Sequence, residues 1–260
     1  MTEHRGFNDG AAYERMMGTW SRLAGGVFLD WLAPISGLRW IDVGCGNGAF
    51  TEMLVDRCAP TEVQGVDPSA AQLAFARARP AARLAEFHQG DAMALPFSEG
   101  RFDAAAMALV IFFVRDPAKG VAEMTRVVCP GGIVAAYAWD MLGDGFPLEP
   151  VFQEMRAMGM TPGAPPSADA SRMEALRALW TGAGLEVVET RVIAVQRTFA
   201  DFDEFWDVMQ GSNVSQDIAA MTATDRELLK TRVRARLPAD AAGRITCSAH
   251  ANAIKGRVPK

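Results

Sequence analysis

The sequence predicts an α/β protein with a mostly parallel sheet covered by helices on both faces. Strand-like and helix-like segments alternate strictly between residues 38 and 139. The strand-like segments are continuous apolar runs rather than in–out alternations, which is typical of parallel strands buried on both faces. Because right-handed crossovers bring the strand-to-helix loops to one edge of such a sheet, we expect a ligand site at that edge.

The first half of the chain carries five of the expected strands. They are predicted at residues 38–43, 62–66, 83–88, from 102 onward, and 133–139. Helices are expected at residues 11–33, 49–57, from Ser69 onward, and 117–128, and Ser69 with Gln72 fits a capping box. The CPGG segment at residues 129–132 is expected to be a turn.

The second half is expected to complete a seven-stranded sheet within one domain. Strands are predicted at residues 185–197 and 245–258, and helices at 148–158, 170–181, 201–210 and 224–237. We therefore divide the chain into an N-terminal helical cap (1–37), a core (38–140) and a C-terminal part (141–260). The last part includes a helical insertion near residues 199–238.

Composition narrows the classes of function. Half of the 260 residues are hydrophobic, and the net charge of −5 argues against a nucleic-acid partner. The basic stretch at residues 230–236 is interpreted as the solvated side of a helix. The four cysteines form no CxxC pair, so free thiols and no metal site are expected. A polar N-terminus and the lack of an 18-residue apolar run predict a cytoplasmic protein without a membrane span.

The stretch WIDVGCGNGAF at residues 40–50 is the main functional signal. Gly44, Gly46 and Gly48 allow positive φ angles and a close approach of a ligand to the backbone, at the N-terminus of the following helix. The second strand ends at Asp67, where an acid can bind the two hydroxyls of a ribose, and Asp91 follows the third strand. The alternative is a tight turn with two helix-capping carboxylates.

The spacing of the glycines discriminates between nucleoside cofactors. The loop reads GxGxG rather than the dinucleotide fingerprint GxGxxG, and no Walker A lysine is present. Asp42 precedes the loop, where it would repel a pyrophosphate and suit a cationic group such as an α-ammonium.

Five motifs in order carry a resemblance to a known family. They are DVGCGNG (42–48), GVDPS (65–69), GDAMALPF (90–97), FDAAAMALVIFFVRDP (102–117) and EMTRVVCPGG (123–132). Together they resemble class I S-adenosylmethionine (SAM)-dependent methyltransferases, and among these the small-molecule branch related to quinone-biosynthesis methyltransferases. The flanks at 13–32 and 198–211 are similar to a bacterial subgroup of that family. The resemblance implies a Rossmann-like fold with SAM as cofactor and S-adenosylhomocysteine (SAH) as product.

The resemblance also implies roles for the matching positions. The cofactor-binding residues would be Asp42, Gly44, Cys45 and Gly46 around the methionine portion, Asp67 on the ribose, Pro68, Asp91, Ala92 and Met93 around the adenine, Ala108 and Leu109 along the sulfonium, and Tyr13, Met17 and Arg22 closing from the N-terminal helix. For the last three residues, helix packing and surface charge are an equal alternative.

One departure from the family pattern bears on the acceptor. Many relatives have histidines where this chain has Phe112 and Phe113, so a general base from that position is missing. Two phenylalanines favour an apolar or aromatic acceptor or a cation–π contact with the sulfonium, the alternative being core packing. Asp140 is the best candidate base, although a loop-capping role is favoured for it, and His88 and His250 are interpreted as structural.

The acceptor pocket is expected above the fourth and fifth strands. Its candidate lining residues are aromatic or long apolar side chains that would otherwise belong to the core: Phe113, Trp139, Phe146, Phe205, Trp206 and Met209. We therefore expect a SAM-dependent methyltransferase, monomeric or homodimeric, that acts on a small hydrophobic or aromatic metabolite. The alternative is a non-catalytic SAM-binding or partner protein on the same fold. An NAD-dependent oxidoreductase is disfavoured by the glycine spacing.

Overall fold

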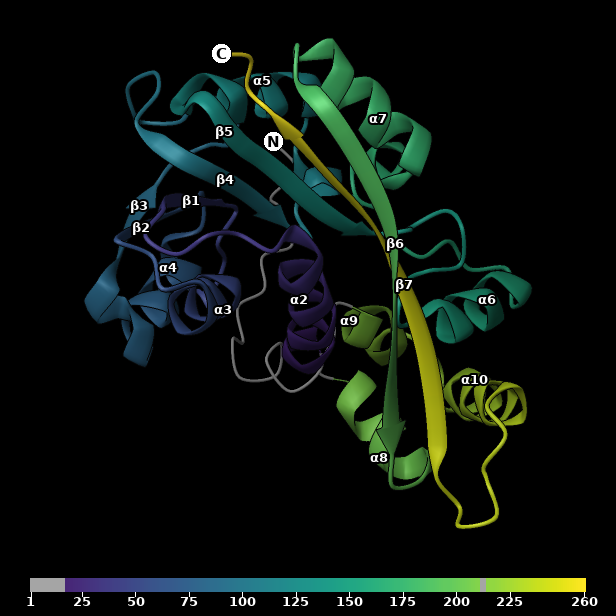
Figure 1. The fold of residues 1–260 in the computed structure, drawn as a ribbon. Coiled ribbons are helices and arrows are strands. Elements are labelled where there is room, and N and C mark those ends of the chain that lie inside the picture. Colours follow the sequence, from purple (N-terminus) through teal and green to yellow (C-terminus); the bar gives the residue numbers. More distant parts are fainter. Residues whose placement is uncertain (1–16, 211–213) are drawn as a thin grey trace.

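A seven-stranded sheet organises the molecule, in a computed structural model that describes residues 17–210 and 214–260 (Figure 1). The strands are β1 (Arg39–Val43), β2 (Glu62–Asp67), β3 (Ala85–Gln89), β4 (Phe102–Ala108), β5 (Val128–Trp139), β6 (Glu186–Phe199) and β7 (Ile245–Arg257). Their order is β3-β2-β1-β4-β5-β7-β6, and only β7 runs antiparallel to its neighbours, β5 and β6. The predicted mostly parallel, seven-stranded α/β fold is confirmed.

Helices cover both faces of this sheet. They are α2 (Thr19–Leu32), α3 (Ala49–Cys58), α4 (Ala70–Arg77), α5 (Pro117–Val127), α6 (Glu149–Ala157), α7 (Met173–Gly182), α8 (Phe202–Met209), α9 (Val214–Ala219) and α10 (Ala223–Arg236). Figure 1 shows α2, α3 and α4 on one side of the sheet and α5 and α7 on the other. Short 3₁₀ turns are η2 (Pro80–Leu84), η3 (Ile111–Phe113) and η4 (Ala168–Ser171).

Local sequence explains why these helices start where they do. The Ser69 hydroxyl accepts a hydrogen bond from the Gln72 backbone N–H (3.3 Å) at the start of α4. The Asp116 carboxylate caps α5 by accepting from the Lys119 N–H (3.1 Å), and Pro117 occupies the first helical position. Both helices follow loops at the ligand edge of the sheet, so their caps also fix those loops.

Three predicted boundaries are wrong, and the reasons are physical. The CPGG segment belongs to β5 rather than to a turn, because Gly131 donates to the Val258 carbonyl (2.8 Å) and Val258 donates back to Gly132 (3.0 Å). Gly131 takes a φ of 78°, so the strand bends without ending. The third strand begins two residues later than expected, after η2, and α7 begins three residues late, after η4.

β6 and β7 extend beyond the end of β5. β5 pairs with residues 251–257 of β7, whereas β6 and β7 continue together to the pair Phe199↔Ile245. The segment between these two strands carries α8, α9 and α10, which lie along the extension (Figure 1).

Ion pairs from α10 hold the helices of this extension together. Lys230 and Arg234 pair with Asp203 of α8 (3.1 and 3.0 Å). Arg232 and Arg236 pair with Glu154 of α6 (3.2 and 2.6 Å), whose side chain is only 9% exposed. The basic stretch at residues 230–236 is thus half-exposed and ion-paired with two neighbouring helices, rather than simply solvated.

Three further observations concern the described part of the chain. None of its helices has the length and apolarity needed to cross a bilayer. The same residues contain no group of three or more His, Cys, Asp or Glu side chains that could hold a metal ion. Cys45, Cys58, Cys129 and Cys247 are free thiols.

Candidate cofactor and acceptor site

Hydrogen bonds tie together the loops that follow β1, β2 and β3. The backbone N–H groups of Gly44 and Cys45 donate to the Val66 carbonyl (2.7 and 3.0 Å). The Gly46 N–H donates to Asp67 Oδ2 (2.9 Å), and the Gly90 N–H donates to the Asp67 carbonyl (3.1 Å). The glycine loop and the acid at the end of β2 therefore meet at one edge of the sheet, as the alternation of strands and helices predicts.

Glycine is needed at the three positions of the loop for different structural reasons. All take positive φ angles: 76° for Gly44, 51° for Gly46 and 80° for Gly48. A Cβ at Gly44 would meet the Val110 side chain at 2.4 Å, and a Cβ at Gly48 would meet Ala76 at 3.0 Å, so these two serve close packing. At Gly46 a Cβ would meet nothing within 4 Å. Gly46 is therefore the position where the backbone faces open space that a ligand can occupy.

Asp42 is fully buried and only partly satisfied. Its Oδ2 accepts from the Thr51 hydroxyl (2.6 Å), but its Oδ1 has no hydrogen-bond partner among the described residues. Burial raises the pKa of the Asp42 carboxyl to about 7, and the nearby charge of Asp67 adds to the increase against the lowering effect of Thr51. A buried carboxylate with a free oxygen is a receptor for a cationic hydrogen-bond donor.

Asp67 is held in place by the backbone. Its two oxygens accept from the Gly46 N–H and the Ser69 N–H (2.9 and 2.8 Å), which fixes the carboxylate at the end of β2. Burial raises its pKa above the ordinary value, whereas the two backbone donors oppose that change. Each oxygen keeps one lone pair, which leaves Asp67 able to accept two further hydrogen bonds.

Cys45 and Pro68 flank these acids in different ways. The Cys45 side chain is 5% exposed and packs over β2, because a Cβ on Gly65 would meet its Sγ at 2.9 Å. Burial and two neighbouring carboxylates raise the pKa of its thiol, so Cys45 stays protonated. Pro68 is exposed beside Asp67.

The loop after β3 lies next to Asp67. The Asp91 carboxylate is exposed and accepts from the Met93 N–H (2.9 Å), which closes a tight turn. Ala92 and Met93 are half-buried and pack against the core. The loop that contains these three residues is joined to the rest of the site by the hydrogen bond from the Gly90 N–H to the Asp67 carbonyl.

The end of β4 and the start of α2 complete the cofactor candidates. Ala108 is half-buried, and Leu109 takes a φ of 61° while its N–H donates to the Tyr137 carbonyl of β5 (2.8 Å). Met17 is buried just before α2, whereas Arg22 is exposed on it. Tyr13 lies outside the described residues.

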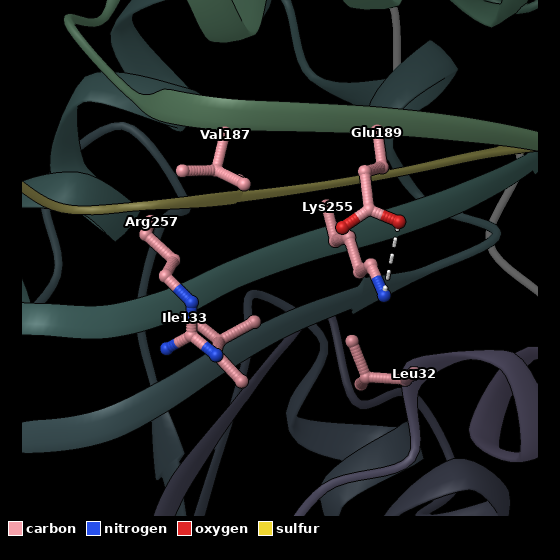
Figure 2. Close-up of a pocket in the computed structure, with 7 residues that line it drawn as sticks. Leu32, Ile133, Val187, Glu189, Lys255 and Arg257 are labelled. Atoms are coloured by element: carbon pink, nitrogen blue, oxygen red, sulfur yellow. Dashed lines mark ion pairs between the residues drawn. The ribbon is translucent and has the colours of Figure 1, made fainter.

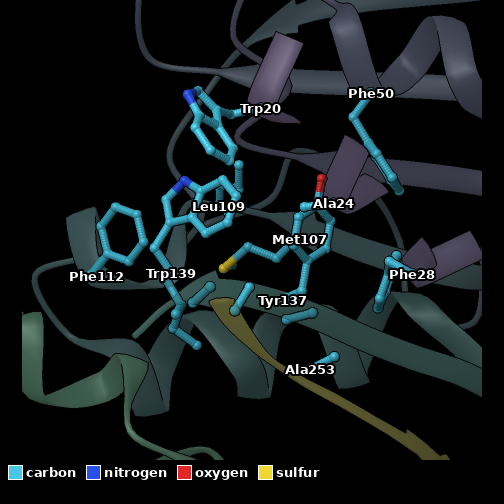
Figure 3. Packing of buried hydrophobic residues seen from close by; sticks show 14 of the residues in the cluster. Trp20, Ala24, Phe28, Phe50, Met107, Leu109, Phe112, Tyr137, Trp139 and Ala253 are labelled. Carbon is cyan, nitrogen blue, oxygen red and sulfur yellow. The ribbon is translucent and has the colours of Figure 1, made fainter. Parts of the chain in front are cut away.

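The predicted acceptor residues fall into separate groups. Trp139 is fully buried at the end of β5 and meets the ring of Trp20 edge-on at 6.4 Å, as Figure 3 shows. Of the two phenylalanines after β4, Phe112 is the buried one and Phe113 is 45% exposed. The buried aromatic side chains near the ends of β4 and β5 are therefore Trp20, Phe112 and Trp139.

The other aromatic candidates lie on neighbouring helices. Phe146 stacks on Phe152 of α6 at 5.4 Å. Phe205 of α8 meets Phe199 of β6 at 5.3 Å, and Trp206 stacks on Phe202 at 5.9 Å. Met209 is also buried on α8. These contacts account for the side chains as packing of α6 and α8, and their role as acceptor lining stays a prediction.

Asp140 is tied into its own loop. Its Oδ1 accepts from the Gly143 N–H (2.9 Å) and its Oδ2 lies 3.6 Å from His250 Nε2. His250 shares a face of β7 with Asn252, which binds the Ser171 carbonyl of η4, whereas Trp139 points to the α2 side. The Asp140 carboxylate is therefore held toward the face opposite the Trp20–Trp139 contact, and its catalytic role remains a prediction.

Two cavities lie away from the strand ends that carry the glycine loop. One holds about 60 Å³ beside the Glu189–Lys255 ion pair (3.5 Å), as Figure 2 shows. The other is an open hollow of about 470 Å³ on the extended part of β6 and β7, next to Gln196, Ser248 and His250. Neither contains a predicted cofactor residue.

Sequence reasoning missed three contributors to this edge. Thr51 is the partner of Asp42, Val110 fills the space left by Gly44, and Trp20 covers Trp139. A signal existed for Thr51, since it lies in the first turn of the helix that follows the glycine loop. No sequence pattern links Trp20 to Trp139.

The chain is similar to known methyltransferases over its central part. Residues 41–136 match the family model described as a methyltransferase domain. Demethylmenaquinone methyltransferase of Thermus thermophilus is 40% identical over 96 residues, which are 36% of this chain and 44% of that protein. The enzyme of the same name from Renibacterium salmoninarum is 35% identical over 144 residues, 54% of this chain and 56% of that protein. The matched part thus spans about half the length of these curated relatives.

Solved structures share the fold. The YcgJ protein of Bacillus subtilis has a TM-score of 0.61 at 18% identity, covering 91% of this chain and 98% of that one. Phosphoethanolamine N-methyltransferase 2 of Haemonchus contortus, solved with SAM, has a TM-score of 0.59 at 19% identity, with coverages of 96% and 56%. The cyclase SpnF has a TM-score of 0.58 at 20% identity, with coverages of 92% and 80%. At these identities the likeness concerns the fold.

The family match and the strand-end geometry agree. The matched residues contain most of β1, all of β2 to β4 and most of β5, and with them Asp42, the glycine loop and Asp67. Residues 41–136 therefore form a methyltransferase domain similar to that of class I SAM-dependent methyltransferases.

Proposed function

We propose that the protein transfers a methyl group from SAM to a small hydrophobic or aromatic acceptor. The observation that carries this proposal is the free, buried Oδ1 of Asp42, which lies in β1 just before the loop that contains the open backbone at Gly46. The α-ammonium of SAM is a cationic donor of the kind that this oxygen requires, and a pyrophosphate is not.

The chain's own residues fit the rest of SAM in the same way. Asp67 keeps lone pairs for two ribose hydroxyls. Asp91, Ala92 and Met93 would border the adenine, and Leu109 would lie along the sulfonium. Bound SAM supplies an electrophilic methyl group, whose carbon takes the acceptor's electron pair while the carbon–sulfur pair stays on sulfur. The protein's part is to align the acceptor and exclude water, which can supply roughly 7–11 kcal/mol.

The acceptor side of the proposal rests on aromatic residues. Trp20, Phe112 and Trp139 are nearly fully buried near the ends of β4 and β5, which supports a flat apolar acceptor. The curated relatives are named for methylation of demethylmenaquinone, and we extend only the class, a quinone-like aromatic compound, to this chain. In this proposal α2 and the helices between β6 and β7 cover the acceptor, and Asp140 assists at most indirectly.

Methyl transfer is tested with methyl-labelled SAM and a panel of phenols, naphthols and reduced quinones. Labelled product from an aromatic acceptor, at a rate lost in Asp67→Ala and retained in Asp103→Asn, is the expected result. Asp103 pairs with Arg39 near the start of β4, away from the site, so the second variant controls for loss of a carboxylate. Labelling of protein or nucleic acid but of no small molecule would contradict the proposal.

A non-catalytic or differently catalytic protein is the second candidate. The structural neighbour SpnF is named as a cyclase, so this fold alone does not establish methyl transfer. This candidate predicts SAM or SAH binding with no labelled product from any acceptor in the panel.

A further inference from the structure

The indole of Trp139 carries an unmet hydrogen-bond donor at the ligand edge of the sheet. Trp139 closes β5, where its backbone pairs with Ala251 of β7, and its side chain is fully buried. Its Nε1 has no hydrogen-bond partner among the residues that the structure describes. In Figure 3 the edge of the ring that carries the nitrogen is turned toward Trp20, with Phe112 beside it.

A buried indole is normally satisfied, and this chain provides the comparison. Trp180 is as fully buried as Trp139, and its Nε1 donates to the Val134 carbonyl at 3.0 Å. Leaving a buried donor without a partner costs about 1–3 kcal/mol. An unmet donor in a position where a ligand is expected therefore indicates a bond that forms only when the ligand is present.

Location separates Trp139 from the other unmet indole. Trp40 also lacks a partner for Nε1, but it lies in β1 with strands paired on both sides, at Val63 and Ala104. Trp139 is the last residue of its strand, and the neighbouring strand β4 ends at Ala108, which pairs with Tyr137. Ligands of open α/β sheets bind at the carboxyl ends of the strands, so the two indoles are not equivalent.

We propose that the Trp139 indole N–H donates a hydrogen bond to an oxygen of the methyl acceptor and thereby selects a phenol or aromatic ketone. This inference rests on the proposed function and deepens it. A neutral N–H donor bonds well to a phenolic, phenolate or carbonyl oxygen and offers nothing to an ammonium group. The rings of Trp20 and Phe112 lie next to the indole, which favours a flat aromatic body attached to that oxygen. Trp139 is thus a positioning residue that fixes how the acceptor lies.

The direct test observes the indole itself. The probes are 1-naphthol and naphthalene, which differ by the oxygen alone, added to indole-¹⁵N-labelled protein saturated with SAH. We expect the Trp139 N–H proton signal to move downfield with 1-naphthol and to lack that shift with naphthalene, while the Trp40 signal stays in place. Contacts with the Trp20 ring assign the Trp139 signal in the wild-type protein, so the measurement does not depend on a variant.

A binding comparison provides the second readout. Trp139→Phe keeps an aromatic ring and removes the donor, and we expect 1-naphthol to bind about tenfold more weakly while naphthalene binds as before. Trp40→Phe is the matched control and should change neither affinity. Equal losses for both probes, an unmoved Trp139 signal on binding of 1-naphthol, or failure of both probes to bind would overturn the inference. Calorimetric binding of SAH, measured in the same samples, shows whether the cofactor part of the proposed function fails independently.

Discussion

The free oxygen of Asp42 makes the affinity for SAH depend on pH. In the free protein the carboxyl titrates with a pKa of about 7, because it is buried and lies near Asp67. An α-ammonium bound to Oδ1 would hold Asp42 ionised, so SAH must compete with a proton for this site below pH 7. The apparent dissociation constant then rises tenfold for each pH unit below the pKa, which is roughly 50- to 100-fold between pH 7.5 and 5.

Isothermal titration at several pH values measures this dependence. Adenosine is the matched ligand, since it lacks the ammonium group and should bind with little change between pH 5 and 7.5. Asp42→Asn is the matched variant, since it removes the titrating group; SAH should bind it weakly and without this slope. An SAH affinity that changes less than threefold in the wild type, or the same slope in Asp42→Asn, would refute the assignment of Asp42 to the ammonium.

The same carboxyl affects the stability of the free protein in a defined direction. Its pKa is raised from 3.8 to about 7 on folding, so the folded state binds the extra proton and is stabilised at low pH. That contribution is present below about pH 4 and is lost as the pH rises through 7, a change of roughly 4 kcal/mol. Urea unfolding should therefore show that Asp42→Asn loses less stability than the wild type between pH 4 and 8.

Two pairs of variants test the packing around the site and its helical cover. Gly44→Ala should unfold at a lower urea concentration than Gly46→Ala. Both variants place an alanine at a positive φ, at a cost of about 1–2 kcal/mol, but only the one at Gly44 would also drive a methyl group into Val110. Equal unfolding midpoints would contradict this. Glu154→Gln should cost about 2 kcal/mol in urea unfolding, because it leaves two arginines of α10 without their nearly buried partner. Asp203→Asn, which removes an exposed partner of the same helix, should leave the midpoint almost unchanged.

The sheet and its ligand edge could be predicted because they depend on local patterns. Continuous apolar runs, the caps at Ser69 and Asp116, and the position of Asp67 at the end of β2 are all readable along the chain. The CPGG segment could not be placed correctly, because its strand conformation depends on pairing with Val258, more than 120 residues away.

The site was only partly predictable for the same reason. The sequence placed Asp42 next to the glycine loop, but its burial and its free oxygen follow from the packing of Thr51 and the neighbouring strands. Which of Phe112 and Phe113 points inward depends on the short turn η3, which the sequence does not specify. Tertiary contacts likewise determine that the charges of α10 meet acids on two other helices.

The central claim is that the edge formed by Asp42, Gly46 and Asp67 binds SAM. Calorimetric titration with SAH, using NAD as the control ligand, tests it most directly on the wild type and on Asp67→Ala. The account predicts that the wild type binds SAH and not NAD, and that Asp67→Ala loses the binding while it still unfolds cooperatively. Binding of NAD, or SAH binding that is unchanged in Asp67→Ala, would contradict it.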